Sequence, residues 1–319
     1  MTAPTTVVSV RADDSLAVVF QRLRTAGVAE ALVTGDDGAT VGTVTDSAIR
    51  RAWMTSGTLA VPVADIVSPR RAFAAETPEP PPLPPPVAVL MVGGRGERLR
   101  PLTEKVPKPL LRIGGTSIVE RIIAKLGAAG VRQAWLAVNY LAEEFEAQVG
   151  DGSHLGVEVR YLHEDEPLGS AGALTLLPEL PATPLLVTNG DLVTTVDYGA
   201  MVDFHRRHAG AITVAAVEHL THVPYGVLRT AEHHVLAIDE KPARRDLVNA
   251  GMYVLEPDVL RLLPVGRFAT MPDLVADVVA EGQPVHAFPL ISGVERWIDI
   301  GSPEEFERVL HAFAIGELE

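Results

Sequence analysis

The sequence predicts an α/β protein: a mixed, mostly parallel sheet with helices on both faces, preceded by a small α+β module. Two observations carry this prediction. Residues 87–319 alternate between apolar runs typical of strands and amphipathic stretches typical of helices. Residues 78–86 read PEPPPLPPP, and seven prolines in nine residues can join neither helix nor sheet. We therefore expect a module over 1–77, a polyproline linker over 78–86 and a larger domain over 87–319.

The module has the order helix–strand–turn–strand–helix. Asp14 or Ser15 can cap a helix, and Gly27 stands just beyond its end. Asp46 is expected to cap a second helix over 47–54. The apolar face of the first helix is Leu16, Val19, Phe20 and Leu23. Strands are expected at 31–33 and 41–45, with a turn at 35–38 between them.

The larger domain opens with an apolar run, Val87 to Val92, as expected for a parallel strand covered on both faces. Ser117 and Glu120 form a capping box that starts a helix. Further strands are expected at 135–138, 157–161, 185–187, 212–217 and 248–255, with a helix at 142–149. In such sheets ligands bind at the carboxyl ends of the strands.

Composition excludes several classes of function. The chain has 319 residues and a formal net charge of −14, which argues against a nucleic-acid partner. There is no cysteine, so thiolate catalysis and disulfides are excluded. The N-terminus lacks the pattern of a signal peptide, and no apolar run approaches the 18 residues of a membrane span. We expect a cytoplasmic protein with no membrane contact.

A glycine-rich loop, 92–99, directly follows the first strand. Glycines let backbone N–H groups approach an anion closely. The loop is neither a dinucleotide fingerprint nor a Walker A loop, because Leu99 stands where the former needs glycine and no GKS or GKT follows. Six basic residues against two acidic ones lie between 95 and 112. In so acidic a protein, this local excess predicts a polyphosphate site.

Three further residues have the chemistry of such a site. Lys108 stands between two prolines, which predicts a fixed point charge. Asp191 follows a strand, and Asp299 is flanked by apolar residues. Two carboxylates plus substrate phosphates make the oxygen shell that Mg²⁺ prefers. His205 and His208 are spaced i, i+3, and without a third ligand we interpret them as surface histidines.

Taken together, the larger domain resembles the sugar-1-phosphate nucleotidylyltransferase family. The motifs that carry the resemblance occur in the family's order and cover nearly all of 87–319. They are GGRGERLRPLT (93–103), PKPLL (107–111), VNYLAEEFEAQVGDGSHLGVEVRYLHEDEPLGSAGAL (138–174), NGDL (189–192), VPYGVL (223–228), DEKP (239–242), VNAGMYVLEP (248–257) and WIDIG (297–301). The resemblance implies a Rossmann-like sheet.

The resemblance also implies roles for individual residues. The catalytic residues would be Arg98, on the departing pyrophosphate, and Lys108. The nucleotide would be bound by Gly93, Gly94, Gly96, Glu97, Asn139 and Gly169, and the sugar phosphate by Tyr225, Gly226, Glu240, Lys241, Asn249 and Gly251. Asp191 and Asp299 would hold Mg²⁺. Two positions depart from the family: Val92 replaces the usual Ala, and Glu97 replaces a frequent Thr and brings a negative charge near the phosphates.

The module resembles a single repeat of the cystathionine-β-synthase (CBS) type. The resemblance implies that Thr43, Thr45 and Asp46 could hold a regulatory nucleotide, although a second repeat would normally complete that site. About 70 residues make a small core, and the stiff proline linker works against docking onto the larger domain. We therefore expect a second copy to cover the module, giving a homodimer or a homotetramer.

The resulting hypothesis is transfer of a nucleotidyl group from an NTP to a sugar 1-phosphate, which gives an NDP-sugar and pyrophosphate. GTP is favoured because the subgroup with such a module resembles guanylyltransferases for mannose-, heptose- or amino-sugar-like 1-phosphates. Alternatives are a UTP- or dTTP-dependent enzyme acting on sugar or cyclitol phosphates and a non-catalytic nucleotide sensor. A glycosyltransferase would need an Asp-x-Asp motif, and Asn189-Gly190-Asp191 is not one.

Overall fold

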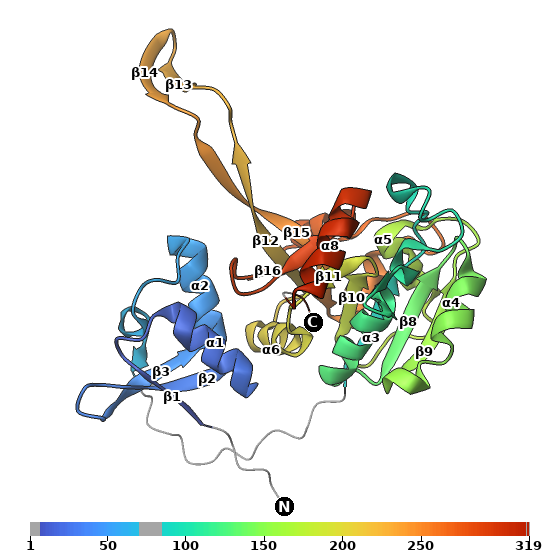
Figure 1. The fold of residues 1–319 in the computed structure, drawn as a ribbon, viewed down its shortest axis with the longest axis horizontal. Helices are drawn as coiled ribbons and strands as arrows, with labels where there is room; N and C mark the ends of the chain where they lie inside the picture. Colours follow the sequence, from blue (N-terminus) through green and yellow to red (C-terminus); the bar gives the residue numbers. More distant parts are fainter. Residues whose placement is uncertain (1–6, 70–84, 317, 319) are drawn as a thin grey trace, which may run out of the picture.

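The computed structural model describes residues 7–69, 85–316 and 318. Figure 1 shows a small N-terminal module beside a larger domain, with a long β-hairpin that projects away from both. The expected linker, 78–86, lies outside the described residues except for Pro85 and Pro86. Within the described ranges, none of the helices is long and apolar enough to cross a bilayer.

The module is a four-stranded sheet with two helices. Its elements are β1 (Val8–Arg11), α1 (Leu16–Ala26), β2 (Glu30–Thr34), β3 (Thr40–Thr45), α2 (Asp46–Ser56), η1 (Val63–Asp65) and β4 (Ser68–Pro69), in the sheet order β1-β2-β3-β4. Ser15 caps α1 and Gly27 ends it, as predicted. The prediction for the second helix was wrong by one residue, because the Thr45 side chain accepts the capping bond from Ala48 N at 3.2 Å.

The apolar face of α1 is fully covered within this chain. Leu16, Val19 and Phe20 are buried in a cluster that also contains Ile291 of the larger domain. Arg50 of α2 crosses the same interface and stacks on Phe288, 3.9 Å from the ring centroid. The expectation that the linker opposes docking, and that a second copy must cover this helix face, was therefore wrong: the module's own strands and α2, together with Ile291 of the larger domain, supply the cover.

The larger domain is built on a seven-stranded sheet. Its elements are β5 (Val87–Met91), η2 (Glu97–Leu99), η3 (Lys108–Leu110), β6 (Arg112–Ile113), β7 (Thr116–Ser117), α3 (Ile118–Ala128), β8 (Gln133–Val138), α4 (Ala142–Val149), η4 (Ser153–Leu155), β9 (Glu158–His163), α5 (Gly169–Gly172), η5 (Ala173–Leu176), β10 (Leu185–Asn189), β11 (Leu192–Thr194), α6 (Tyr198–His208), β12 (Ile212–His222), β13 (Val227–Ala231), β14 (His234–Asp239), β15 (Ala243–Leu255), η6 (Pro257–Leu262), α7 (Met271–Ala280), β16 (Val285–Pro289), β17 (Trp297–Asp299) and α8 (Pro303–Ala314). The predicted capping box at Ser117 and Glu120 is confirmed.

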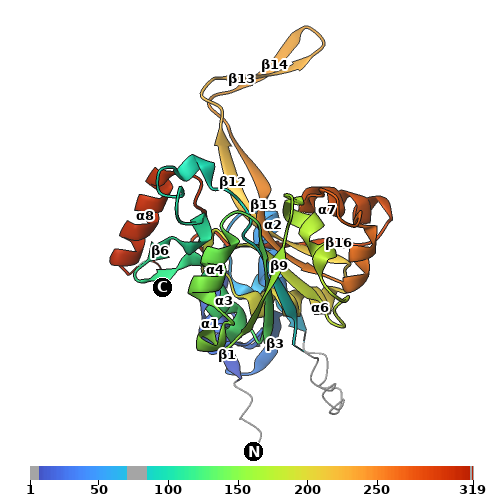
Figure 2. The same cartoon turned by 90° about the vertical axis from the view of Figure 1, so that its right-hand side faces the viewer.

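The sheet has the order β16-β12-β15-β10-β5-β8-β9. All neighbouring pairs are parallel except the two that involve β15, so the prediction of a mixed, mostly parallel sheet is confirmed. Buried residues of α3, α4, α6 and α8 cover one face, and those of α5 and α7 cover the other (Figure 2). β5, β8 and β10 run in the same direction in adjacent positions, so the loops that follow them meet at one edge.

The projecting hairpin was not foreseen. β12 and β15 continue past the sheet, well beyond the predicted 212–217 and 248–255, and β13 and β14 form its tip (Figure 1). We call residues 218–247 the arm. It exposes large apolar side chains that have no neighbour to cover them, namely Leu220, Leu228, Val235, Leu236, Ile238 and Leu247. A two-stranded ribbon of this kind is marginally stable by itself in water.

Candidate active site

The glycine loop occupies the predicted place after β5. Gly96 has φ 60°, a left-handed conformation that favours glycine, and its carbonyl accepts a hydrogen bond from Thr103 Oγ1 at 2.7 Å. A Cβ on Gly93 would lie 3.0 Å from Glu164 Oε1 and 3.2 Å from Asn139 Cβ. The loop therefore packs closely against its neighbours, which side chains at these positions would disturb.

This loop borders a cavity of about 640 Å³. Its volume suits a nucleotide-sized ligand. Of the residues predicted to bind or act on substrates, eight line it: Gly93, Gly94, Gly96, Glu97, Arg98, Lys108, Gly169 and Asp191. Met91, Val92, Arg95, Leu99, Pro109, Glu164, Pro167, Ser170, Asn189, Ile300 and Gly301 complete the lining.

Lys108 joins the two predicted metal ligands. It is 7% exposed, and its Nζ lies 2.5 Å from Asp191 Oδ2 and 3.4 Å from Asp299 Oδ1. Asp191 follows β10, and Asp299 ends β17, which pairs with β11 so that Leu192 stands opposite Asp299. The fold thus brings together one cation and two carboxylates that are far apart in the sequence. We call these three residues the Lys108 cluster.

The Lys108 cluster fits a hard divalent cation. Both carboxylates contact the same ammonium, so their oxygens converge on one point, and their side chains are 29% and 45% exposed, so a ligand can reach them. Mg²⁺ is usually held by one or two carboxylates together with substrate phosphates. In the part of the chain that the structure describes, no group of three or more His, Asp or Glu residues could hold a metal alone, so phosphate oxygens would have to complete the shell.

Sequence reasoning missed Glu164, which lies between the glycine loop and Gly169. Glu164 Oε2 accepts a hydrogen bond from Leu168 N at 2.8 Å, and its backbone carbonyl accepts one from Asn139 Nδ2 at 2.7 Å. Burial raises the pKa of Glu164 above its usual value, although the bond from Leu168 N opposes the shift. A signal was available, because Glu164 directly follows β9 and so stands at a strand's carboxyl end.

Asn249 and Gly251 lie behind the cavity wall. Gly251 has φ 71°, and a Cβ there would come 2.5 Å from Nδ2 of Asn189, which lines the cavity. Asn249 Oδ1 accepts a hydrogen bond from Gly251 N at 2.9 Å. Gly251 therefore packs against Asn189, and Asn249 holds Gly251. Neither residue lines the cavity, whereas the resemblance implies direct contact with the sugar phosphate.

Six more predicted residues do not line the cavity of their own chain. Asp299 and Asn139 lie next to the lining residues Lys108 and Gly93, and the other four are farther away. Tyr225, Gly226, Glu240 and Lys241 lie on the arm, and Tyr225 is 74% exposed. The reason is the length of β12 and β15, which leave the sheet together and carry the intervening turns outward. The expectation that these residues line the sugar-phosphate side is not met by the cavity as it stands within one chain.

Two other expectations need correction. Asp46 was expected to contact the ribose of a regulatory nucleotide, but its carboxylate is buried and accepts a hydrogen bond from Arg50 Nε at 2.7 Å. His205 is not a surface residue: it is completely buried, with Nδ1 2.9 Å from Thr213 Oγ1 and Nε2 3.2 Å from Glu256 Oε1. Helical spacing predicted the face on which His205 lies, but not that β12 covers that face.

Comparison with known proteins gives a consistent result. Residues 87–314 match the family described as "Nucleotidyl transferase". The chain is 34% identical over 227 residues to the mannose-1-phosphate guanylyltransferase of Mycobacterium tuberculosis. It is 36% identical over 228 residues to the mannose-1-phosphate guanylyltransferase catalytic subunit beta of Drosophila pseudoobscura pseudoobscura. Each match covers 69% of this chain, but the chain spans only 62% and 60% of those relatives, respectively.

Solved structures show the same fold. HddC from Yersinia pseudotuberculosis is 26% identical in sequence and superposes with a TM-score of 0.55. The superposition covers 71% of this chain and 99% of HddC. A putative glucose-1-phosphate thymidylyltransferase from Bacillus anthracis is 21% identical, with a TM-score of 0.57 over 70% of this chain and 93% of that one. The family match begins at residue 87, so the N-terminal module lies outside it.

Proposed function

We propose a reaction from one premise: the chain belongs to the nucleotidyl transferase family. The proposed reaction is transfer of a nucleotidyl group from an NTP, with GTP favoured, to a sugar 1-phosphate. The products are an NDP-sugar and pyrophosphate. The observation that carries the proposal is the Lys108 cluster, which lies at the border of the cavity that the glycine loop also lines.

The residues suit an in-line displacement. An oxygen of the sugar phosphate attacks the α-phosphorus, the bond from that phosphorus to the bridging oxygen breaks, and pyrophosphate leaves with the electron pair. The nucleophile is already an anion, so no protein base is required. Arg98 and Lys108 stabilise the charge that grows on the phosphates, and the backbone of 93–96 orients them. Asp191 and Asp299 would hold Mg²⁺, which supplies further charge neutralisation when bound.

The preference for GTP is supported by the relatives rather than by a contact to a base. Both curated relatives described above are named as guanylyltransferases of mannose 1-phosphate. A site facing the base is available at Gly169 and Ser170, small residues in the cavity wall. Mannose or heptose 1-phosphates are the sugar substrates that we would test first.

A matrix of five NTPs against a panel of sugar and cyclitol 1-phosphates, with pyrophosphate release as the readout, tests the proposal. We expect Mg²⁺-dependent release that needs both substrates and is fastest with GTP. A dominant rate with UTP or dTTP would contradict the choice of base but not the reaction. No release with any pair would contradict the reaction and favour a nucleotide sensor.

We also propose that the protein is a homodimer, or a tetramer built from dimers, and that it works in the cytoplasm. The support for assembly is the arm, whose apolar side chains need cover that its own chain does not supply. An identical surface on a second copy gives a closed two-fold contact. The lack of cysteine agrees with a reducing compartment.

Light scattering on the full-length chain tests the assembly. Leu236→Arg, at the tip of the arm, should shift the mass toward that of the monomer. Val265→Arg is the matched control, because Val265 is equally apolar, is 83% exposed and lies outside the arm. A wild-type monomer at micromolar concentration, or an assembly unaffected by Leu236→Arg, would contradict the proposal.

A further inference from the structure

The two acidic residues of the Lys108 cluster share one small structural unit. β11 starts next to Asp191, and β17 ends at Asp299, in an antiparallel pair of three residues per strand. At about 3.3 Å per residue, the far end of this pair lies roughly 10 Å from the carboxylates. Because the pair is short, whatever holds its far end also controls the spacing and direction of both carboxylates.

The far end is closed by hydrogen bonds between the two strands. Thr194 Oγ1 donates to the Arg296 carbonyl at 2.7 Å, Thr195 N donates to the same carbonyl at 3.0 Å, and Arg296 N donates to Thr195 Oγ1 at 2.9 Å. Lys125 of α3 also donates to the Thr194 carbonyl. The body of the domain therefore holds one side of this end.

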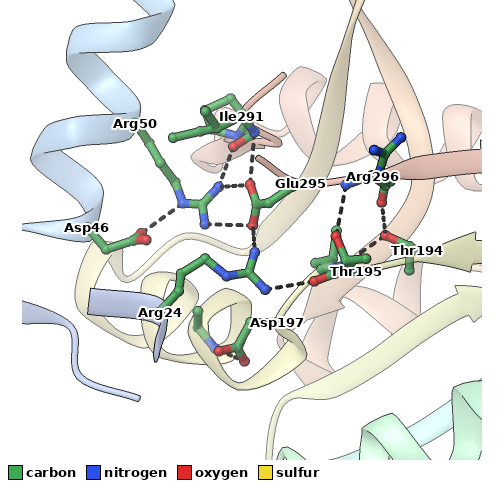
Figure 3. A network of polar contacts seen from close by, with 12 residues as sticks. Arg24, Asp46, Arg50, Thr194, Thr195, Asp197, Ile291, Glu295 and Arg296 are labelled. Atoms are coloured by element: carbon green, nitrogen blue, oxygen red, sulfur yellow. Dashed lines mark hydrogen bonds and ion pairs between the residues drawn. The ribbon is translucent and has the colours of Figure 1, made fainter. Parts of the chain in front are cut away.

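The N-terminal module holds the other side (Figure 3). Arg24 Nη2 donates to the Thr195 carbonyl at 2.8 Å, next to β11, and Nη1 donates to Glu295 Oε1 at 2.9 Å, just before β17. One planar guanidinium thus joins the two strands. Arg50 fixes Glu295 from a second direction, with bonds of 2.7 and 3.0 Å.

Docking alone does not account for these contacts. The Glu295 side chain is completely buried, and burying a carboxylate is costly compared with an apolar contact of similar shape. The apolar cluster around Leu16, Phe20 and Ile291 already joins the module to the domain. What the arginines add is direction, because the rigid fork of a guanidinium accepts few arrangements of its acceptors.

We infer that Arg24 is a positioning residue, through which the N-terminal module orients Asp191 and Asp299 for metal binding. The inference rests on the proposed function, since that function requires the metal. On this inference, the module contributes to catalysis without binding a ligand itself. Residues hydrogen-bonded directly to metal ligands typically contribute about 10- to 100-fold to metal affinity. Arg24 acts at one remove, through Thr195 and Glu295. Lys125 shares the task, so we expect the lower end of that range.

The test is Arg24→Met in the full-length chain. Arg22→Met is the matched control, because Arg22 is on the same helix but pairs with Asp14 inside the module. Mn²⁺ binding is measured by electron paramagnetic resonance with a non-hydrolysable GTP analogue, without turnover. We expect R24M to bind Mn²⁺ about 10-fold more weakly, with kcat lowered by a similar factor and the KM for the NTP unchanged, while R22M behaves as wild type.

A second variant guards against a folding defect. Arg24→Lys keeps the charge and can reach one acceptor but not both in a fork, so its Mn²⁺ affinity should fall between wild type and R24M. Wild-type affinity in R24M and R24K, or an equal loss in R22M, would overturn the inference. If the wild-type protein itself fails to bind Mn²⁺ with the analogue, the proposed function fails instead, so the two failures are distinguishable.

Discussion

Two clusters in this molecule have the same charges and opposite surroundings. The Lys108 cluster joins one cation to Asp191 and Asp299, whose side chains are 29% and 45% exposed. The Arg50 cluster, which we define as Arg50, Asp46 and Glu295, joins one cation to two carboxylates that are 8% and 0% exposed. Both cations are themselves buried.

The difference lies in what the carboxylates can still do. In the Arg50 cluster every charged group is paired within the protein, and Glu295 also pairs with Arg24. Burial by itself would lower the pKa of Arg50, but Glu295 and Asp46 beside it raise that pKa above its usual value. Such a group can only hold structure together. In the Lys108 cluster both carboxylates remain accessible, and that of Asp191 lines the cavity, so they can bind a ligand. Accessibility of the anions, rather than the ion pairs themselves, therefore separates the cluster that we propose to be functional from the structural one.

The largest effect is expected for Arg50→Met. The substitution leaves Asp46 buried without its cation and Glu295 paired with Arg24 alone, and breaking a buried pair in this way costs about 3–5 kcal/mol. The urea midpoint of the full-length chain should fall accordingly, and the N-terminal module should become sensitive to protease.

The control for Arg50→Met is Arg51→Met, an exposed neighbour on the same helix, which should unfold as wild type. An unchanged midpoint in Arg50→Met would mean that the Arg50 cluster does not stabilise the docked module.

Lys108→Ala and Asp191→Ala should show the reverse pattern. Each removes a charge that acts on the phosphates or the metal, so turnover should fall by about 10²-fold or more. The free energy of unfolding should change little, because the carboxylates left by Lys108→Ala are accessible to water and Asp299 still pairs with Lys108 in Asp191→Ala. Pyrophosphate release and urea unfolding on the same preparations separate the two effects. A folded variant that keeps more than roughly a tenth of the wild-type rate would refute the role of that residue.

A further pair, in which His205 is buried and Glu256 is 47% exposed, tests the comparison by titration. Burial lowers the pKa of His205, and Glu256 offsets part of the shift, while His286 and Arg206 add to it. The unfolded chain therefore takes up the proton at a higher pH than the native chain does. Stability should be full above about pH 6.5, the usual pKa of histidine, and should fall as the pH drops below it.

His205→Asn should flatten the dependence of the urea midpoint on pH between about 7 and 5. The control is His154→Asn, because the His154 side chain is half exposed and lies on η4, far from His205 in the sequence. If the slope is the same in all three proteins, His205 does not contribute to it. This is the smallest of the expected effects, because only the charge of His205 is affected and Glu256 offsets part of its pKa shift.

Sequence alone determined the features that depend on neighbours along the chain. The buried run at Val87 predicts β5, Ser117 and Glu120 predict the start of α3, and the glycines of 93–96 predict a loop that approaches an anion. Asp191 was recognisable because it follows an apolar strand, and Asp299 because apolar residues flank it. These signals are local because helix periodicity, capping and glycine conformation involve only residues a few positions apart.

Tertiary structure alone decided which distant residues meet. Arg50 and Glu295 are 245 positions apart. Asp46 and Arg50 stand i, i+4 on one helix, but only the docked larger domain buries that pair. Burial of His205 follows from the packing of α6 on β12, and the arm follows from how far two antiparallel strands continue without a core beneath them. Pairing across the fold depends on docking and strand register, which arise from the sum of many weak contacts and leave no signature at any single position.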